Sequence, residues 1–196
     1  MLVSVFLWFL VDYLYVMGRT YTAPLGFDIR HTYSIVISSL SERSPDYIPK
    51  EKRERPDGVH LLTALDRIRT YPGVESACLT DGGMPYYMGS RNLVWRIDTL
   101  QVPCRYAFVT PEFFDVFRIY DKDGKTASLK RAIEDNNSIV ISADVETMNP
   151  GLSLLGQKAY RGNVTDEIEE TIRGISVPIR RHEYTKAEPN AIGPCG

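Results

Sequence analysis

The segment GLSLLGQK (151–158) comes close to the pattern of a phosphate-binding loop. That pattern is G-x-x-x-x-G-K-[ST], in which backbone N–H groups surround the phosphates and the hydroxyl binds Mg²⁺. Here Gln157 separates Gly156 from Lys158, and neither Ser nor Thr follows the lysine. The segment is therefore expected to form a turn, and the sequence predicts no nucleotide-binding site.

The segment DKDG (121–124) resembles the start of a calcium-binding loop. In such a loop the glycine is the sixth residue, and a glutamate follows six positions later. Gly124 is only the fourth residue of this segment, and Lys130 stands where the glutamate is required. A tight turn without a metal ion is expected here.

Histidine and serine patterns also fail to indicate an active site. No histidine lies four residues from another ligand, and the G-x-S-x-G motif of serine hydrolases does not occur. We therefore assign no catalytic, cofactor-binding or metal-ligating residue and expect a protein that is not an enzyme. An enzyme whose site is not recognisable from sequence is kept as a third alternative. The histidines are His31, His60 and His182.

The three cysteines form no metal-binding or redox motif, because the sequence has no C-x-x-C pair. Buried free thiols are expected. One disulfide is chemically feasible in an oxidising compartment, and the sequence leaves its pairing open. The cysteines are Cys78, Cys104 and Cys195.

The composition is that of one ordinary globular domain, of at most two lobes. The 196 residues are 43% apolar and 24% charged, with a formal net charge of −2. Nucleic acid is not expected as a partner, because binding to it requires a basic face. The run KEKRER (50–55) alternates in sign, which is typical of a solvated linker.

The chain begins with an apolar segment, residues 1–11, which only Ser4 interrupts before Asp12. As a helix this segment covers about 16 Å, around half of the roughly 30 Å hydrocarbon core of a bilayer. No Lys or Arg precedes Arg19 and no small-residue cleavage site follows, which argues against a signal peptide. We expect the outer half of a membrane helix whose inner half is missing. A buried amphipathic helix is the alternative.

Residues 32–81 are expected to form a β-α-β unit. The segment TYSIVISS (32–39) is rich in β-branched residues, as buried strands are. A helix is expected over 56–73 with Asp57 as its cap, and a second strand over 74–81. The apolar face of that helix consists of Val59, Leu62, Leu65 and Ile68.

The rest of the chain is expected to be rich in strands. The segment TPEFFDVF (110–117) is predicted as a short helix, with Thr110 as N-cap and its three phenylalanines buried. A further helix is expected over 126–137. An acidic loop (166–170) should join the last two strands. The expected strands are 92–99, 104–110, 138–145, 156–164 and 171–181.

Four segments together resemble the extracytoplasmic core domain of MacB/FtsX-like ABC transporter permeases. Each segment is apolar and degenerate, but all four occur in the family's order and cover most of residues 32–192. Gly174 takes the glycine position of the family's V-v-G-V-v strand, and Gly156 and Lys158 match its G-k turn. The segments are YPGVESACLTD (71–81), YAFVTPEFFDVFRI (106–119), SIVISADVETMNPG (138–151) and TIRGISVPIRRHEY (171–184).

The resemblance implies an α+β fold, a two-lobed periplasmic core domain preceded by an N-terminal helix. A β-α-β lobe would hold residues 32–81 and the returning strand 171–181, and a β-rich lobe would span 84–165. Residues 1–20 would be the C-terminal part of a transmembrane helix and its exit. Residues 21–196 would be the extracytoplasmic core domain, truncated at its C-terminal end.

The resemblance also implies a non-catalytic role at the inner (cytoplasmic) membrane, with the domain facing the periplasm. A separate cytoplasmic ATP-binding subunit would hydrolyse ATP, and the domain would couple that hydrolysis to export or to control of periplasmic protein partners. The full-length permease is expected to be a homodimer, and its cargo is not indicated. The alternative is a free-standing, membrane-anchored ligand-binding protein.

The substitution Asp12→Leu is expected to strengthen membrane insertion of residues 1–17. A carboxylate costs about 2.5–3.5 kcal/mol at the centre of a membrane helix and far less near the headgroups, so the gain reports the depth of this position. Insertion is measured with a reporter fusion. An unchanged efficiency would place Asp12 outside the hydrocarbon boundary.

Overall fold

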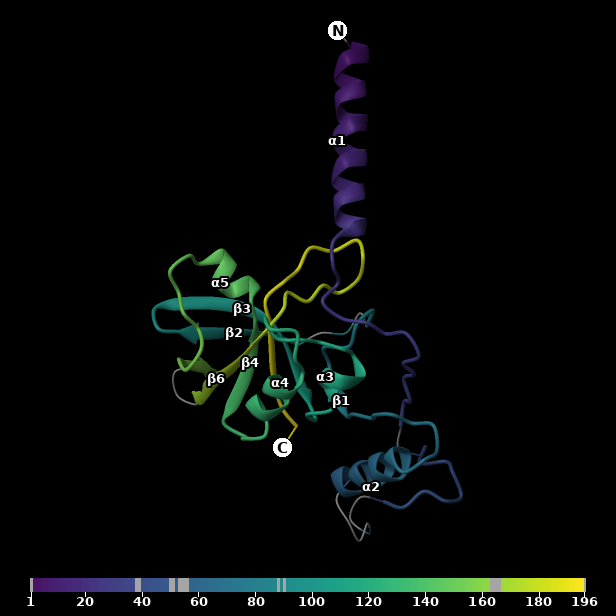
Figure 1. The fold of residues 1–196 in the computed structure, drawn as a ribbon. Coiled ribbons are helices and arrows are strands. Elements are labelled where there is room, and N and C mark those ends of the chain that lie inside the picture. Colours follow the sequence, from purple (N-terminus) through teal and green to yellow (C-terminus); the bar gives the residue numbers. More distant parts are fainter. Residues whose placement is uncertain are drawn as a thin grey trace.

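The computed structural model shows a long N-terminal helix above a small β-barrel, with a second helix to one side (Figure 1). The predicted linker 50–55, apart from Lys52, lies outside the described residues, as do residues 38 and 39 and the side chain of Asp57. The structure describes residues 2–37, 40–49, 52, 57–87, 89, 91–162 and 167–195.

Six strands close into the barrel in the order β3-β2-β5-β6-β4-β7. β7 completes the closure, because it pairs in parallel with β3 and antiparallel with β4. β4 and β6 are also parallel, and the other neighbours are antiparallel. A two-residue strand, β1 (Thr80–Asp81), pairs with the end of β3. The barrel strands are β2 (Arg91–Ile97), β3 (Leu100–Val109), β4 (Ser138–Ser142), β5 (Lys158–Arg161), β6 (Ile168–Ser176) and β7 (Asn190–Pro194).

This arrangement confirms the α+β class and most of the predicted strands. The expected neighbours 92–99 and 104–110 pair as β2 and β3, and the expected pair 156–164 and 171–181 forms β5 and β6. β7 was not predicted, because its sequence NAIGP contains two residues that are rare in strands.

The inside of the barrel is filled by side chains from alternate strand positions. Trp95 and Tyr106 are fully buried there, with ring centroids 5.4 Å apart. Gly193 provides the space for that packing, since a Cβ at this position would lie 2.3 Å from the Tyr106 hydroxyl. The other buried residues of this inner core are Ile97, Val102, Cys104, Ile139, Ile141, Val145, Leu154, Ala159, Ile172 and Ala191.

Two short helices, α3 (Phe113–Val116) and α4 (Ala127–Ala132), cover one outer face of the barrel. Phe113, Phe114 and Phe117 are buried against this face, as predicted. These aromatic rings, Leu129 of α4 and Ile133 just after it form a second core with the outward-facing residues of β3, β4 and β7.

The predicted N-cap at Thr110 is wrong. Its Oγ1 instead accepts a hydrogen bond from the backbone N–H of Leu79 at 3.1 Å, so it is used to join the chain before β1 to the end of β3. Glu112 stands at the N-cap position of α3 and makes no side-chain cap bond. A further short helix, α5 (Asp144–Met148), follows β4 where a small helix was expected.

The predicted β-α-β unit over 32–81 is wrong in its strands. Residues 32–37 form no strand, because none of the described strands pairs with them, and Tyr33, Ile35, Val36 and Ile37 are exposed. Of the predicted strand 74–81, only β1 forms.

The helix of that unit is confirmed as α2 (Asp57–Arg69), but it lies apart from the barrel (Figure 1). Of its predicted apolar face only Leu65 is buried, and Leu62 is half-exposed. Its C-terminal end is fixed by an ion pair between Arg69 and Glu112, at 2.5 Å. The strand predicted to return to this unit is β6, which instead pairs with β4 and β5, so the predicted β-α-β lobe does not form.

The N-terminal helix α1 (Leu2–Thr22) passes through Asp12 without a break and projects away from the barrel (Figure 1). Residues Val3–Thr22 are long and apolar enough to cross a membrane, and their side chains are not buried by the rest of the chain. The expectation that the apolar segment covers half a bilayer therefore underestimates the length of the apolar helix, because apolar and aromatic residues continue beyond Asp12.

The substitution Gly174→Ala is expected to lower the free energy of unfolding by about 1–3 kcal/mol, the usual cost of overpacking. A Cβ at this position of β6 would lie 2.8 Å from Val140, 3.0 Å from Ala132 and 3.3 Å from Leu129. Thermal unfolding of the whole chain in detergent measures the effect. Gly58→Ala is the control, since no atom lies within 4 Å of its added Cβ; equal stability of the two variants would contradict the prediction.

Candidate functional site

The most distinctive polar arrangement joins the end of α1 to the loop that leaves β6. Arg180, in this loop, is only 4% exposed. Its Nη1 donates to the carbonyl of Ala23 and its Nε to the carbonyl of Thr185, both at 2.7 Å, and its Nη2 donates to the carbonyl of Glu183. One guanidinium therefore holds the exit of α1 against the turn at 182–185 of the loop.

The chemistry of this contact explains why the residue is an arginine. A guanidinium presents five N–H donors in a planar fork, so it can satisfy several carbonyl groups at once. Hydrogen bonds from charged donors are worth about 1.5–3 kcal/mol each, more than neutral ones. The backbone adds a further bond, from the N–H of Arg180 to the carbonyl of Leu25 at 2.9 Å.

Two further contacts fix the same junction. Gly26 has φ +81°, and a Cβ there would lie 2.0 Å from the carbonyl oxygen of Pro178, so only glycine fits this crossing of the two segments. The rings of Tyr21, in the last turn of α1, and Tyr184, in the loop, are 6.2 Å apart. The junction thus consists of a buried cation, a close backbone crossing and an aromatic pair.

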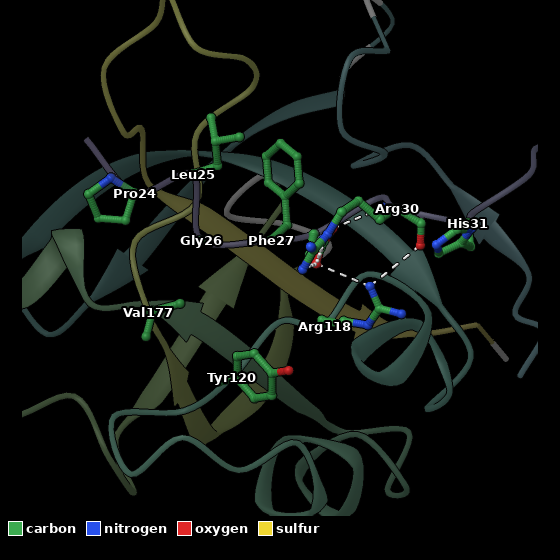
Figure 2. Close-up of a pocket in the computed structure, with 10 residues that line it drawn as sticks. Pro24, Leu25, Gly26, Phe27, Arg30, His31, Arg118, Tyr120 and Val177 are labelled. Atoms are coloured by element: carbon green, nitrogen blue, oxygen red, sulfur yellow. Dashed lines mark hydrogen bonds and ion pairs between the residues drawn. The ribbon is translucent and has the colours of Figure 1, made fainter. Parts of the chain in front are cut away.

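A cavity of about 600 Å³ lies beside the junction, between the chain that follows α1 and the end of β6 (Figure 2). Its wall is apolar where Phe27 and Val177 line it and charged where Arg30 and Arg118 do. The lining residues are Pro24, Leu25, Gly26, Phe27, Asp28, Arg30, His31, Arg118, Tyr120 and Val177.

Asp28 organises the charged wall of this cavity. Its carboxylate lies 2.7 Å from Nη2 of Arg30 and 3.1 Å from Nη1 of Arg118. The side-chain and backbone hydrogen bonds from Arg30 hold the pKa of Asp28 well below its usual range, so it stays ionised. These charged groups bind one another, which helps to fix the chain after α1.

The segments that resembled ligand-binding loops have structural roles. In DKDG, Oδ1 of Asp121 accepts from the backbone N–H groups of Asp123 and Lys125, at 2.9 and 2.8 Å, which closes the predicted tight turn. Residues 151–157 form turns, and Lys158 begins β5 with its Nζ 2.6 Å from Glu169. Among the described residues, no group of three or more His, Cys, Asp or Glu is placed to hold a metal ion.

The three histidines lie in three different parts of the structure. His31 lines the cavity, His60 is exposed on α2, and His182 lies in the loop after β6. Nδ1 of His182 accepts from the backbone N–H of Tyr184 at 3.2 Å, which shapes that loop.

The cysteines are free thiols, but they are not all buried. Burial raises the pKa of Cys104, inside the barrel, and of half-buried Cys78 to about 12, which makes both thiols unreactive at neutral pH. Cys195 is exposed, contrary to the expectation, because it follows the last residue of β7.

The sequence analysis did not identify Arg180, Gly26 or the cavity. The pair Arg180–Arg181 after a strand was the available signal, within the segment TIRGISVPIRRHEY. That signal says nothing about the partners, because the carbonyl of Ala23 lies 157 positions away in the chain.

Comparison with known proteins gives similarity in structure only. No family model and no curated protein matches the chain. A domain of a protein described as a permease, from Porphyromonas gingivalis, has a TM-score of 0.48 and 20% sequence identity; the match covers 67% of this chain and 50% of that one.

Two other solved structures are similar at a comparable level. The periplasmic region of MacB from Actinobacillus actinomycetemcomitans has a TM-score of 0.45 and 10% identity over 68% of this chain and 54% of that one. The extracellular domain of YknZ, a noncanonic ABC-type transporter from Gram-positive bacteria, has a TM-score of 0.45 and 12% identity. That match covers 67% of this chain and 60% of that one. The chain thus matches half to three fifths of each domain, and these are domains of the class that the four sequence segments resemble.

The substitution Arg180→Met is expected to lower the free energy of unfolding by about 3 kcal/mol, because three carbonyl groups lose a charged donor and the losses do not add fully. Unfolding of the whole chain in detergent measures this change, and protease cleavage within 181–189 should become faster. Arg173→Met is the control. Its side chain is half-exposed and paired with Asp135, so a change within about 0.5 kcal/mol is expected. A similar small change in Arg180→Met would show that the junction does not depend on the guanidinium.

Proposed function

We propose that this chain is the extracytoplasmic domain, with its membrane helix, of a MacB/FtsX-like ABC transporter permease. The observation that carries the proposal is an unburied apolar helix fixed to a barrel by the Arg180 network. The order of the four sequence segments supports it independently. In this assignment α1 lies in the inner membrane and the barrel faces the periplasm.

The side chains of α1 support a location in lipid. A contiguous apolar surface of this size is unfavourable in water and marks a membrane or protein contact. Residues Tyr13, Tyr15 and Tyr21 extend this surface toward the barrel, where aromatic rings favour the membrane interface. The apolar residues of the first three turns, each at least half exposed, are Val3, Val5, Phe6, Leu7, Trp8, Phe9, Leu10 and Val11.

The proposed mechanism is mechanical. A separate cytoplasmic ATP-binding subunit binds and hydrolyses ATP, and the membrane helices of the permease move in response. The junction passes the displacement of α1 to the barrel, because Ala23 and Leu25 are bonded to Arg180 and Gly26 is packed against Pro178. The barrel itself carries out no chemical step; it drives export or acts on periplasmic protein partners, within a homodimer when full length.

A second candidate function is a free-standing, membrane-anchored ligand-binding protein. The cavity beside the junction favours it, since about 600 Å³ is within the range of small-molecule sites. Ion pairing of Asp28 with two arginines leaves less of the wall free for a ligand.

Affinity purification of the full-length gene product from native membranes separates the two functions. A permease is expected to co-purify with an ABC ATPase, and the reading frame to continue into further apolar segments. Purification of a protein with a single anchor and without an ATPase would replace the permease by the ligand-binding protein.

The junction is expected to stay closed in every nucleotide state. With Cys195→Ser as background, the pair Tyr21→Cys and Tyr184→Cys should react with a short bifunctional thiol reagent equally fast with and without ATP, since their rings are 6.2 Å apart. The control pair combines Tyr21→Cys with Leu155→Cys on the exposed turn before β5 and should not cross-link. Loss of cross-linking on addition of ATP would show that the junction opens and does not transmit the motion of α1.

A further inference from the structure

Arg105 is a buried arginine whose hydrogen-bonding capacity is largely unused. It lies on β3, on the outer side of the barrel, and is 6% exposed. Its Nε and Nη2 are buried without a hydrogen-bond partner in the chain. A buried charged donor without a partner is costly, and such groups normally bind an acceptor. The described residues give these two nitrogens no acceptor.

The polar neighbours of Arg105 are already occupied. Asn190 stands opposite it on β7, and the Asn190 Nδ2 donates to the carbonyls of Ile179 and Glu188, at 3.2 and 2.6 Å. The backbone N–H of Asn190 donates to Oγ of Ser142 at 2.9 Å. These bonds hold the strand edge in place and use the backbone and side-chain donors of Asn190.

A second arginine, Arg181, lies close to the first. Its Nε is also buried without a partner, and its nearest carboxylate, on Glu188, is 3.7 Å from Nη2, beyond hydrogen-bond length. Burial and the neighbouring Arg181 charge lower the pKa of Arg105, and Glu188 opposes this only in part. Two guanidinium groups therefore share one half-exposed carboxylate, and the cluster carries an excess positive charge.

We propose that Arg105 and Arg181 form a binding site for a small phosphate-type oxyanion. Guanidinium forks match the geometry of phosphate oxygens, and three buried N–H-bearing nitrogens are free to donate. The side chains of Arg181 and Glu188 are 22% and 50% exposed, so these two residues connect the pair of arginines to solvent. The proposal goes beyond the coupling role, because it gives the domain a ligand.

The location links this ligand to the junction. Arg181 follows Arg180 directly, and the loop that carries both rises from β6 to the base of α1 and returns to β7 (Figure 1). An anion held by Arg105 and Arg181 would fix this loop against the barrel, and so stabilise the segment to which the α1 exit is bonded.

Titration of the whole chain with inorganic phosphate tests the site, in zwitterionic detergent and at constant ionic strength set with chloride. Binding by calorimetry and a rise in the unfolding temperature are expected. Arg105→Met and Arg181→Met should each weaken binding about tenfold or more, the effect of losing a charged hydrogen bond. If Arg105→Met does not fold, Arg181→Met, at a more exposed residue, still tests the site. Glu188→Gln should tighten binding, because it removes the competing carboxylate.

Arg118→Met is the matched control, since it removes an arginine from the cavity and should leave the phosphate affinity unchanged. Bilayer discs with phosphatidylglycerol, compared with phosphatidylcholine, distinguish a lipid headgroup from the free ion. If phosphatidylglycerol stabilises the protein and Arg105→Met abolishes this effect, the ligand is the lipid headgroup. If inorganic phosphate binds in the detergent, the ligand is the free ion. The proposal is overturned if phosphate has no effect in either medium. It is also overturned if phosphate affects the Arg105 and Arg181 variants as strongly as the unchanged protein.

Discussion

The guanidinium of Arg180 is the interaction on which the arrangement of the molecule depends. It binds carbonyls of two segments that are far apart in sequence, the exit of α1 and the loop after β6. The position of α1 and of the cavity wall formed by residues 24–28, 30 and 31 depends on that contact. Since each partner is a backbone carbonyl, the identities of Ala23, Glu183 and Thr185 matter less than the path of the chain.

Barrel closure provides the rigid base for this contact. β7 lies between β3 and β4, so the loop that Arg180 anchors begins on one barrel strand, β6, and ends on another, β7. Both ends of the loop are held by backbone hydrogen bonds. In the proposed coupling, displacement of α1 would therefore act on the barrel at two points, the ends of this loop on β6 and β7.

Sequence patterns predicted the parts of the fold that local periodicity determines. β2, β3, β5 and β6 alternate inward and outward residues, and the Phe113–Phe117 segment buries its rings, so these elements were predictable. The absence of a strand at 32–37 was not predictable. β-branched residues favour strand pairing, but a strand forms only where a partner strand is present. The junction and the Arg105 site depend on contacts across more than 70 positions, and no short motif records them.

The unpaired segment 33–37 has a consequence for the behaviour of the protein in solution. Tyr33, Ile35, Val36 and Ile37 combine high β-propensity with exposed backbone groups and no charge. Such a segment is a template for intermolecular strand addition, the route to β-aggregates. This segment therefore adds a tendency to associate that the barrel does not have. A charged residue in place of Val36, the most exposed of them, would act as a gatekeeper without touching the folded core.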